Sequence, residues 1–268
     1  MITINKTCTI LINLIIILYI LNVNIEFIEL ICYNFNMTKT WSEVYINKEI
    51  EKFGNIEAFL NRDWQSIMKK KTRLRQNFFN LILKNANNGK PIIECGSGTG
   101  ITTSYLSSLG YECYGIDLDQ NLVYLSQQLS SIISPQNKPH FFIGDINKIP
   151  FDDKFFSVSH SHGVLEHFND DQIITILNEQ LRVADKVIFS VPSTYFNANM
   201  TDGHVFGDER YLTNKEWVEI IKQSNGTLVS ISGDHQRSLK KRMLKLINNP
   251  LRILKPKAFS VFEIHNNN

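Results

Sequence analysis

The sequence has few cysteines, few prolines and almost no net charge. Its 268 residues include 4 cysteines, 7 prolines and 13 glycines, and the 28 basic and 26 acidic residues give a net charge of +2. A hydrophobic content of 43% with only 20% charged residues excludes a wholly disordered chain. The composition also excludes a collagen-like repeat and a multi-pass membrane protein. The small net charge by itself predicts no polyanionic partner.

The four cysteines are scattered along the chain, at Cys8, Cys32, Cys95 and Cys113. Their spacing matches neither the paired pattern of a metal site nor a dense disulfide framework. We therefore predict no metal ion, and a reducing compartment is the simpler interpretation.

The N-terminus carries an apolar run. Residues 7–25 contain no charged residue, which is close to the roughly 20 residues that a helix needs to cross a bilayer. Three interpretations remain open: a membrane anchor, a cleaved signal peptide, or an upstream extension before a start at Met37. The third leaves a cytoplasmic protein. The signal peptide is disfavoured because no small-residue cleavage site follows the run. Residues 1–36 are set apart as this leader.

Residues 37–90 are predicted to be a helical N-terminal cover. Thr40 or Ser42 would cap a first helix that ends at Gly54, and a second helix is expected over roughly residues 74–83. The basic stretch Lys69–Arg75 is expected between these helices, as a solvent-exposed helix face.

Strands and helices alternate from Pro91 onward. Strands are expected at 92–95, 113–118, 141–143, 155–159, 186–191, 227–232 and 259–264, with helices at 101–110, 121–133, 169–183 and 213–224. This alternation is typical of a parallel sheet covered on both faces. We predict an α/β fold for residues 91–268, with a doubly wound, Rossmann-like seven-stranded sheet.

A glycine-rich turn follows the first of these strands directly. Glu94 and Cys95 precede Gly96, Gly98 and Gly100, which let the backbone turn sharply and let a ligand approach closely. The G-x-G-x-G spacing differs from the G-x-G-x-x-G fingerprint, in which a pyrophosphate lies on a helix N-terminus. An acid at position 94 would repel a pyrophosphate but would suit an ammonium group.

These motifs resemble those of the class I S-adenosylmethionine (SAM)-dependent methyltransferases, particularly the small-molecule-type subgroup. The resemblance implies that the seven-stranded sheet is mostly parallel with an antiparallel last strand. Beyond the turn, the resemblance rests on Asp117 at the end of the second strand, Gly144-Asp145 at the end of the third, and Val164–His167 after the fourth. In the family, the second-strand acid binds the ribose hydroxyls and the third-strand aspartate pairs with the adenine amino group. The cofactor-binding residues implied for this chain are Glu94, Gly96, Ser97, Gly98, Gly100, Asp117, Leu118, Asp145, Ile146 and Ser161.

Catalysis by this family requires no universal catalytic residue, because the sulfonium of SAM is already activated. A base is needed only for a protonated acceptor. The resemblance places the acceptor pocket at the loop after the fourth strand, so His162 is a candidate base or substrate contact. His204, in a polar loop after the fifth strand, is the second candidate. His160, His167 and Tyr45 are weaker ones.

Residues 237–257 form a basic insertion with eight lysines and arginines and no acid. Its interleaved leucines predict a short amphipathic helix. This segment would either contact a membrane or an anionic substrate, or be an ordinary surface helix. Membrane contact through residues 7–25 is a separate interpretation. Nucleic acid is disfavoured because no aromatic stacking platform accompanies the charges.

The fourth-strand sequence also lacks the motifs of DNA amino methylation and of pyrimidine C5 methylation. The resulting hypothesis is a SAM-dependent methyltransferase acting by in-line displacement on a small-molecule or lipid-like acceptor. Contact between this acceptor and the basic insertion would favour an anionic acceptor. A non-catalytic SAM-binding regulatory or scaffold protein is the alternative. An NAD-dependent oxidoreductase is disfavoured by the glycine spacing.

Overall fold

The computed structural model describes residues 40–43, 46–47, 52, 54–87, 89–194, 209–234 and 258–267. The chain divides into two compact units, Met1–Glu43 and Val44–Asn268. In the first unit, the backbone N–H of Thr40 donates to the Glu43 carboxylate and that of Glu43 donates to the Thr40 hydroxyl. This reciprocal capping box begins a helix at Trp41, as the cap prediction required.

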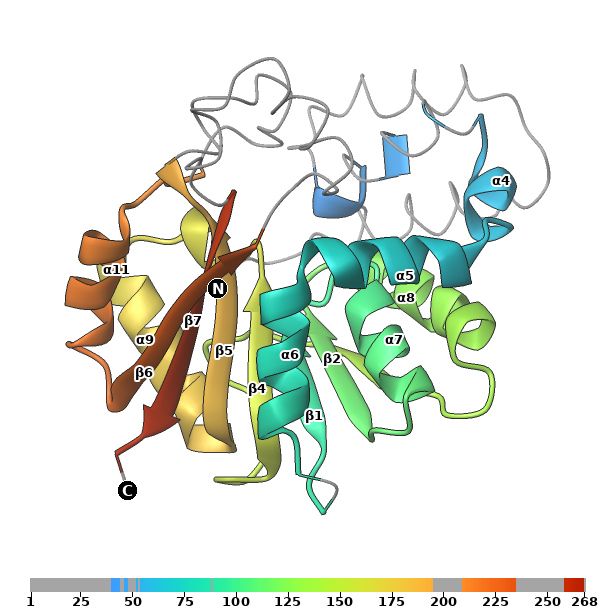
Figure 1. Cartoon of the computed structure of the whole chain (residues 1–268). Coiled ribbons are helices and arrows are strands. Elements are labelled where there is room, and N and C mark those ends of the chain that lie inside the picture. The colour runs from blue at the N-terminus through green and yellow to red at the C-terminus, as the bar shows by residue number, and fades with distance from the viewer. Residues whose placement is uncertain are drawn as a thin grey trace, which may run out of the picture. The chain divides into compact units, whose positions relative to one another are not determined.

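The second unit is built on a seven-stranded sheet with the order β3-β2-β1-β4-β5-β7-β6 (Figure 1). The strands are β1 (Ile92–Cys95), β2 (Cys113–Asp117), β3 (His140–Ile143), β4 (Phe156–His162), β5 (Ala184–Pro192), β6 (Gly226–Asp234) and β7 (Phe259–Asn266). Only β7 runs antiparallel to its neighbours. The predicted fold class is confirmed.

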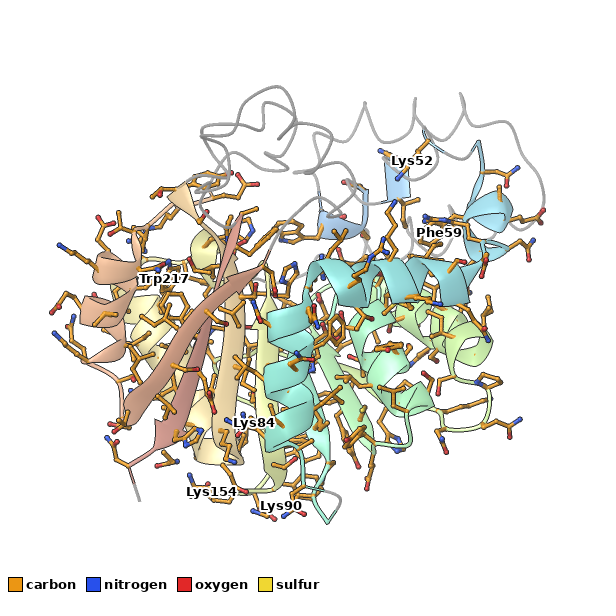
Figure 2. The ribbon with its side chains drawn as sticks, viewed as in Figure 1. Lys52, Phe59, Lys84, Lys90, Lys154 and Trp217 are labelled. Carbon is orange, nitrogen blue, oxygen red and sulfur yellow. The ribbon has the colours of Figure 1, made fainter. Side chains whose placement is uncertain are left out.

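Helices cover both faces of this sheet (Figure 1). One face carries α5 (Trp64–Leu74), α6 (Gln76–Asn85), α7 (Ile101–Ser108) and α8 (Gln120–Ile133), after the short α4 (Ile56–Leu60). The other carries α9 (Asp170–Val183) and α11 (Asn214–Ile221). Figure 2 shows Trp217 of α11, which is fully buried and lies 5.5 Å from the ring of Phe189 on β5. Each face of the sheet thus has its own apolar core.

The predicted limits of the N-terminal helices were wrong. Most of the basic stretch belongs to α5, which Asp63 caps through a bond from Ser66 N–H, and α6 begins at Gln76 after a turn at Arg75. Lys69 and Lys70 are exposed, so the expectation of a solvated helix face is confirmed. Charged residues cannot signal a helix limit when the apolar stripe continues through them.

The fourth strand is longer than predicted. It continues through His160 and His162, because these residues pair with Ile188 and Ser190 of the neighbouring parallel strand β5. After it, residues 165–167 form a 3₁₀ turn, and α9 begins after a capping box of Asn169 and Gln172.

Several predicted features lie outside the described residues: the apolar run 7–25, Tyr45, His204 and the basic insertion 237–257. Within the described part of the chain, no helix has the length and apolarity needed to cross a bilayer. The ends that flank the insertion are described. Asp234 and Phe259, described residues on either side of it, pair with each other at the edge where β5 ends.

Candidate active site

The glycine turn between β1 and α7 is held in a left-handed backbone conformation at all three glycines. A Cβ added at Gly100 would lie 2.5 Å from atoms of Phe141 and Ser126, and one added at Gly96 would lie 2.6 Å from Val164. A Cβ at Gly98 would meet no atom within 4 Å. Gly96 and Gly100 are therefore required by packing, whereas Gly98 borders open space that a ligand can enter.

Asp117 connects this turn to the end of β2. One carboxylate oxygen accepts a hydrogen bond from Gly98 N–H at 2.7 Å, and the other accepts one from Asp119 N–H at 3.0 Å. Burial raises the pKa of Asp117 above its ordinary value, although both backbone hydrogen bonds act in the opposite direction. Each oxygen keeps lone-pair capacity for a further donor, such as a ligand hydroxyl.

Glu94 stabilises the start of α7. Gly100 is the N-cap of this helix and has no side chain to cap it, but the Glu94 carboxylate accepts bonds from both the backbone N–H and the hydroxyl of Thr103. Thr103 is the third helical residue, which is where an N-cap side chain normally binds. Burial raises the pKa of Glu94 to about 7, against the lowering effect of these hydrogen bonds. The acid predicted to face an ammonium group is thus also a structural cap.

Apolar side chains stand exposed beside these acids. Leu118, next to Asp117, is 74% exposed, and Ile143 at the end of β3 is 49% exposed. Asp145 is exposed and accepts hydrogen bonds from the backbone and side chain of Asn147. Ile146 is buried in the core beneath. An exposed apolar surface between two carboxylates suits a flat ring with polar edges.

The end of β4 carries buried polar groups. His160 and His162 lie on the same face of the sheet, as the alternation predicted, and their rings lie 5.8 Å and 5.6 Å from that of Phe78 on α6. His162 also lies 5.0 Å from Phe259. Burial lowers the pKa of His160 to about 3. Burial, together with the charges of Arg75 and Lys71, holds the pKa of His162 well below its ordinary value. Both imidazoles are therefore neutral near pH 7.

Several buried polar atoms of the sheet and of the glycine turn have no hydrogen-bond partner among the described residues. They are Ser97 Oγ, Ser161 Oγ, Ser190 Oγ, Ser232 Oγ, His162 Nδ1 and both ring nitrogens of His160. Most buried polar groups in proteins are satisfied, and each exception needs an explanation. Ser97 follows the first glycine of the turn, and Ser161 is the last residue but one of β4. Polar atoms that lack partners at the carboxyl edge of the sheet are available to a polar ligand.

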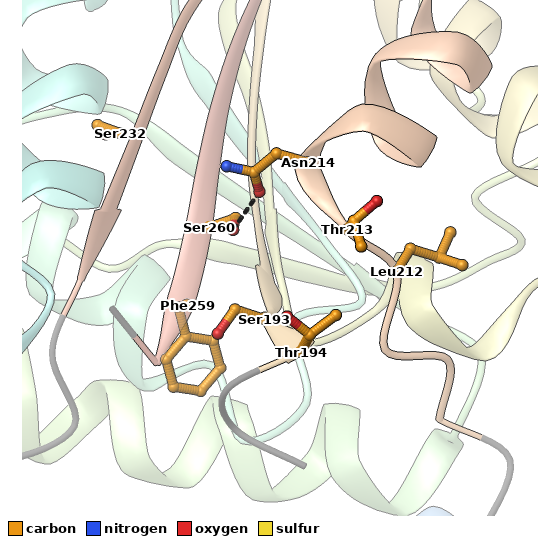
Figure 3. Close-up of a pocket in the computed structure, with 8 residues that line it drawn as sticks. All are labelled: Ser193, Thr194, Leu212, Thr213, Asn214, Ser232, Phe259 and Ser260. Carbon is orange, nitrogen blue, oxygen red and sulfur yellow. Dashed lines mark hydrogen bonds between the residues drawn. The ribbon is translucent and has the colours of Figure 1, made fainter. Parts of the chain in front are cut away.

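A pocket of about 360 Å³ opens at the same edge, where β5, β6 and β7 meet the start of α11 (Figure 3). It is lined by Ser193, Thr194, Leu212, Thr213, Asn214, Ser232, Phe259 and Ser260. The sequence did not predict these residues as a site. They come from four separate segments, and the capping box at Thr213 was the only signal that any of them gave.

The structure therefore gathers the residues of the glycine turn, Asp117 and Leu118 at one edge, with Asp145 following the adjacent strand. His162 and Ser161 lie at the end of β4, two strands away from β2 in the sheet order. Lys90 and Lys154 mark the opposite end of the sheet (Figure 2). No cluster of three or more His, Cys, Asp or Glu side chains suited to a metal occurs in the described ranges.

Comparison with known proteins bears directly on this edge of the sheet. Residues 93–186, from β1 into β5, match the family model described as a methyltransferase domain. This part of the chain is a methyltransferase domain. The predicted family is confirmed, and with it the methyl donor of such domains, SAM.

Solved structures share the fold at low identity. Magnesium protoporphyrin IX methyltransferase from Synechocystis, solved with bound SAM, is 14% identical with a TM-score of 0.53, and the match covers 85% of this chain and 89% of that one. A chain in the complex of the Haloferax volcanii Trm112 methyltransferase activator is 13% identical with a TM-score of 0.57, covering 75% and 93%. The [4+2]-cyclase SpnF is 11% identical with a TM-score of 0.52, covering 71% and 80%. At these identities the likeness shows the fold of this methyltransferase domain and no more.

Proposed function

We propose that this chain binds SAM at the carboxyl edge of β1, β2 and β3 and transfers its methyl group to a small-molecule or lipid-like acceptor held beyond β4. The observation that carries the proposal is the junction of Gly98 and Asp117. A glycine that borders open space donates its N–H to a buried strand-end carboxylate, and an exposed leucine lies beside them. That combination offers hydroxyl acceptors and an apolar face in one place.

Each part of the cofactor has a residue of suitable chemistry. Asp117 would accept the two ribose hydroxyls, and Leu118 would cover a face of the adenine, whose amino group would donate to Asp145. Ile146 supports that region from the core. Glu94 would attract the ammonium group, and the partnerless hydroxyls of Ser97 and Ser161 would bind polar atoms of the methionine part. Gly96 and Gly100 fix the turn that brings these groups together.

The bound cofactor supplies an activated methyl group on a sulfonium, which an acceptor nucleophile displaces in line. The protein's contribution is alignment of the two reactants and exclusion of water. His162 is neutral and partly buried, so its role would be to accept a hydrogen bond from the acceptor. Its lowered pKa makes it a weak base at neutral pH. His204 stays a second candidate for the same role.

Two observations support an enzyme over a non-catalytic scaffold. A scaffold would have a filled acceptor region, whereas a pocket opens beside Phe259, whose ring contacts that of His162. The Synechocystis protein is named for a small-molecule acceptor, a porphyrin. A small-molecule acceptor is therefore the better-supported class.

The division into a leader (1–36), a helical cover (37–90) and a SAM-binding domain (91–268) stays part of the proposal. So does membrane contact through 7–25 or 237–257. Liposome binding by the wild type and by a variant with Lys240, Lys241 and Arg242 neutralised would test the second segment. Equal binding by the two proteins would remove it.

Calorimetric titration with SAM tests the cofactor site, with Asp117→Ala compared against Asp119→Ala. Asp119 caps α8 by accepting hydrogen bonds from Asn121 N–H and Leu122 N–H, so its loss costs about 1 kcal/mol of stability. We expect Asp117→Ala to lose SAM binding while keeping its circular dichroism spectrum, and Asp119→Ala to retain binding. Unchanged affinity in Asp117→Ala would remove Asp117 from the site. A labelled-methyl screen of small molecules would then test transfer.

A further inference from the structure

The basic side chains at the end of α5 face in two directions. Lys69, Lys70 and Arg73 are exposed, whereas Lys71 and Arg75 are half-buried. The backbone N–H of Arg75 donates to the carbonyl of Lys71 at 2.9 Å, so the helical turn extends through both residues. Residues four apart in a helix lie on the same face. Lys71 and Arg75 are therefore a pair on the inward side of α5.

The same inward row begins with apolar side chains. Trp64 and Met68 are buried, and the row continues from them to Lys71 and Arg75 in steps of three or four residues. Such steps mark the core-facing stripe of a helix. The first turns of α5 thus pack on the apolar core, and the last turn directs two cations to the same side.

The inward side of α5 lies near the end of β4. Figure 1 shows α5 at the edge of the sheet where β4 ends, with α6 leading from it along the face of the sheet. Phe78, in the first turn of α6, lies 5.6 Å from the ring of His162. Asp234, at the end of β6, accepts hydrogen bonds from Asn77 N–H at 2.9 Å and from Phe78 N–H at 3.0 Å. These contacts hold the junction of the two helices beside His162.

The charges of both cations reach His162. Burial has the largest effect in lowering the pKa of this imidazole, and the charges of Arg75 and Lys71 lower it further. Arg75 also acts on Glu94, where burial raises the pKa and the hydrogen bonds from Thr103 and the charge of Arg75 oppose that rise. A position at which cations disfavour a protonated imidazole is one at which they favour an anion.

We propose that Lys71 and Arg75 bind an anionic group of the methyl acceptor, such as a carboxylate, beside His162. That the occupant is the acceptor rests on the proposed function. An anion at this position offsets the desolvation of two half-buried cations, and the positive sulfonium of a bound cofactor adds to the attraction. The pair as a whole acts on His162, which the proposed function places at the acceptor.

Two probes of the same shape test the selection by charge: benzoate and benzamide. Binding of each to the full chain is measured by ligand-observed NMR at millimolar concentration, with S-adenosylhomocysteine present. We expect benzoate to bind more strongly than benzamide, and the preference to shrink as sodium chloride is added. Equal binding of the two probes, stronger binding of benzamide, or no binding of either would overturn the proposal.

The two directions of the basic side chains supply matched variants on one helix. Lys71→Gln and Arg75→Gln remove the inward charges, and each should weaken benzoate about threefold to tenfold while leaving benzamide unchanged. Lys70→Gln and Arg73→Gln remove exposed charges and should change neither probe. If the inward and exposed variants weaken benzoate equally, the general charge of the helix attracts it and no site exists. If none of the four weakens it, the proposal also fails.

The carboxylate of the cofactor is the competing partner of Arg75, because Arg75 also acts on Glu94. Calorimetry with S-adenosylhomocysteine and with its decarboxylated analogue separates the two sources of the anion. We expect Arg75→Gln to change both affinities by the same factor. A loss confined to S-adenosylhomocysteine would show that Arg75 binds the cofactor's carboxylate, and the assignment to the acceptor would fall.

The same titrations separate this proposal from the proposed function. If S-adenosylhomocysteine binds the wild type and benzoate is not preferred, the anion site is wrong and the methyltransferase assignment stands. If the cofactor fails to bind while benzoate and the four variants behave as expected, the cation pair binds anions. The proposed function then falls, and with it the identity of the occupant as a methyl acceptor.

Discussion

Glu94 should make both stability and SAM affinity depend on pH. Its pKa is raised from 4.5 to about 7 by burial, and each unit corresponds to about 1.36 kcal/mol. Since the folded-state pKa lies above the unfolded one, the protonated carboxyl stabilises the fold fully below about pH 4.5. That stabilisation is lost as the pH rises through about 7. The loss between those values is about 3 kcal/mol.

The perturbation is Glu94→Gln, which keeps an acceptor for Thr103 but carries no charge. We expect the variant to gain stability relative to the wild type by about 3 kcal/mol between about pH 5 and about pH 8. The assay is urea denaturation of both proteins across that range. The difference between the two proteins cancels the contributions of all other titrating groups. A difference in the free energy of unfolding between the two proteins that stays constant over this pH range would refute the argument.

Glu263→Gln provides a control of opposite sign. Burial raises the pKa of Glu263, but hydrogen bonds from Ser230, His265 and Asn85 outweigh that effect, and the net pKa is lowered. Its stabilisation is present above about pH 4.5 and is lost as the pH falls through the folded-state value. The Glu263 variant should therefore lose stability relative to the wild type at neutral pH.

The same titration should appear in cofactor binding. An ammonium group near Glu94 favours the ionised carboxylate, so binding below about pH 7 should release a proton. SAM affinity of the wild type should rise with pH, and the measured enthalpy should vary with the ionisation enthalpy of the buffer. If the SAM affinity does not change with pH and the binding enthalpy does not change with the buffer, Glu94 does not contact the ammonium group.

The remaining predictions concern single side chains. Gly98→Ala should fold, with a loss of about 1 kcal/mol of stability from its positive φ, and should lose SAM affinity. Gly100→Ala should be strongly destabilised, because the added methyl group overlaps Phe141. Urea denaturation and calorimetry would show the contrast, and equal stability of the two variants would refute it. Asp234→Ala should cost about 1–2 kcal/mol, because this carboxylate caps α6 through the N–H groups of its second and third residues; a melting temperature equal to that of the wild type would contradict this. His162→Gln should slow methyl transfer by up to about tenfold without changing SAM affinity. For the wild type, His162 itself should cause no loss of rate between about pH 8 and about pH 6, since its imidazole stays neutral there.

The strands and the glycine turn were predictable because their signals are local. Apolar runs of three to six residues, glycines at fixed spacing and the residues that begin the helices at Asn169 and Thr213 each depend on neighbours in the sequence. The order of acids at successive strand ends then indicated a common edge, since parallel strands end on the same side. The seven strands followed from these local signals, whereas the antiparallel direction of β7 was expected only from the resemblance to the methyltransferase family.

Contacts between distant residues could not be predicted in this way. Asp234 caps α6 from more than 150 residues away, and Asn85 meets Glu263 across a similar separation. The start of α6 was placed wrongly because its cap lies on β6 and not in its own sequence.

The amino-acid sequence by itself determined the kind of fold, the position of the glycine turn and the acids that follow each strand. Only the tertiary structure decided that Gly98 borders open space while Gly100 is packed, that Glu94 caps a helix, and that four separate segments line one pocket. The physical reason is that dihedral preferences and hydrophobic periodicity act over a few residues. Burial and partnership of polar groups, by contrast, depend on which elements the folded sheet brings together.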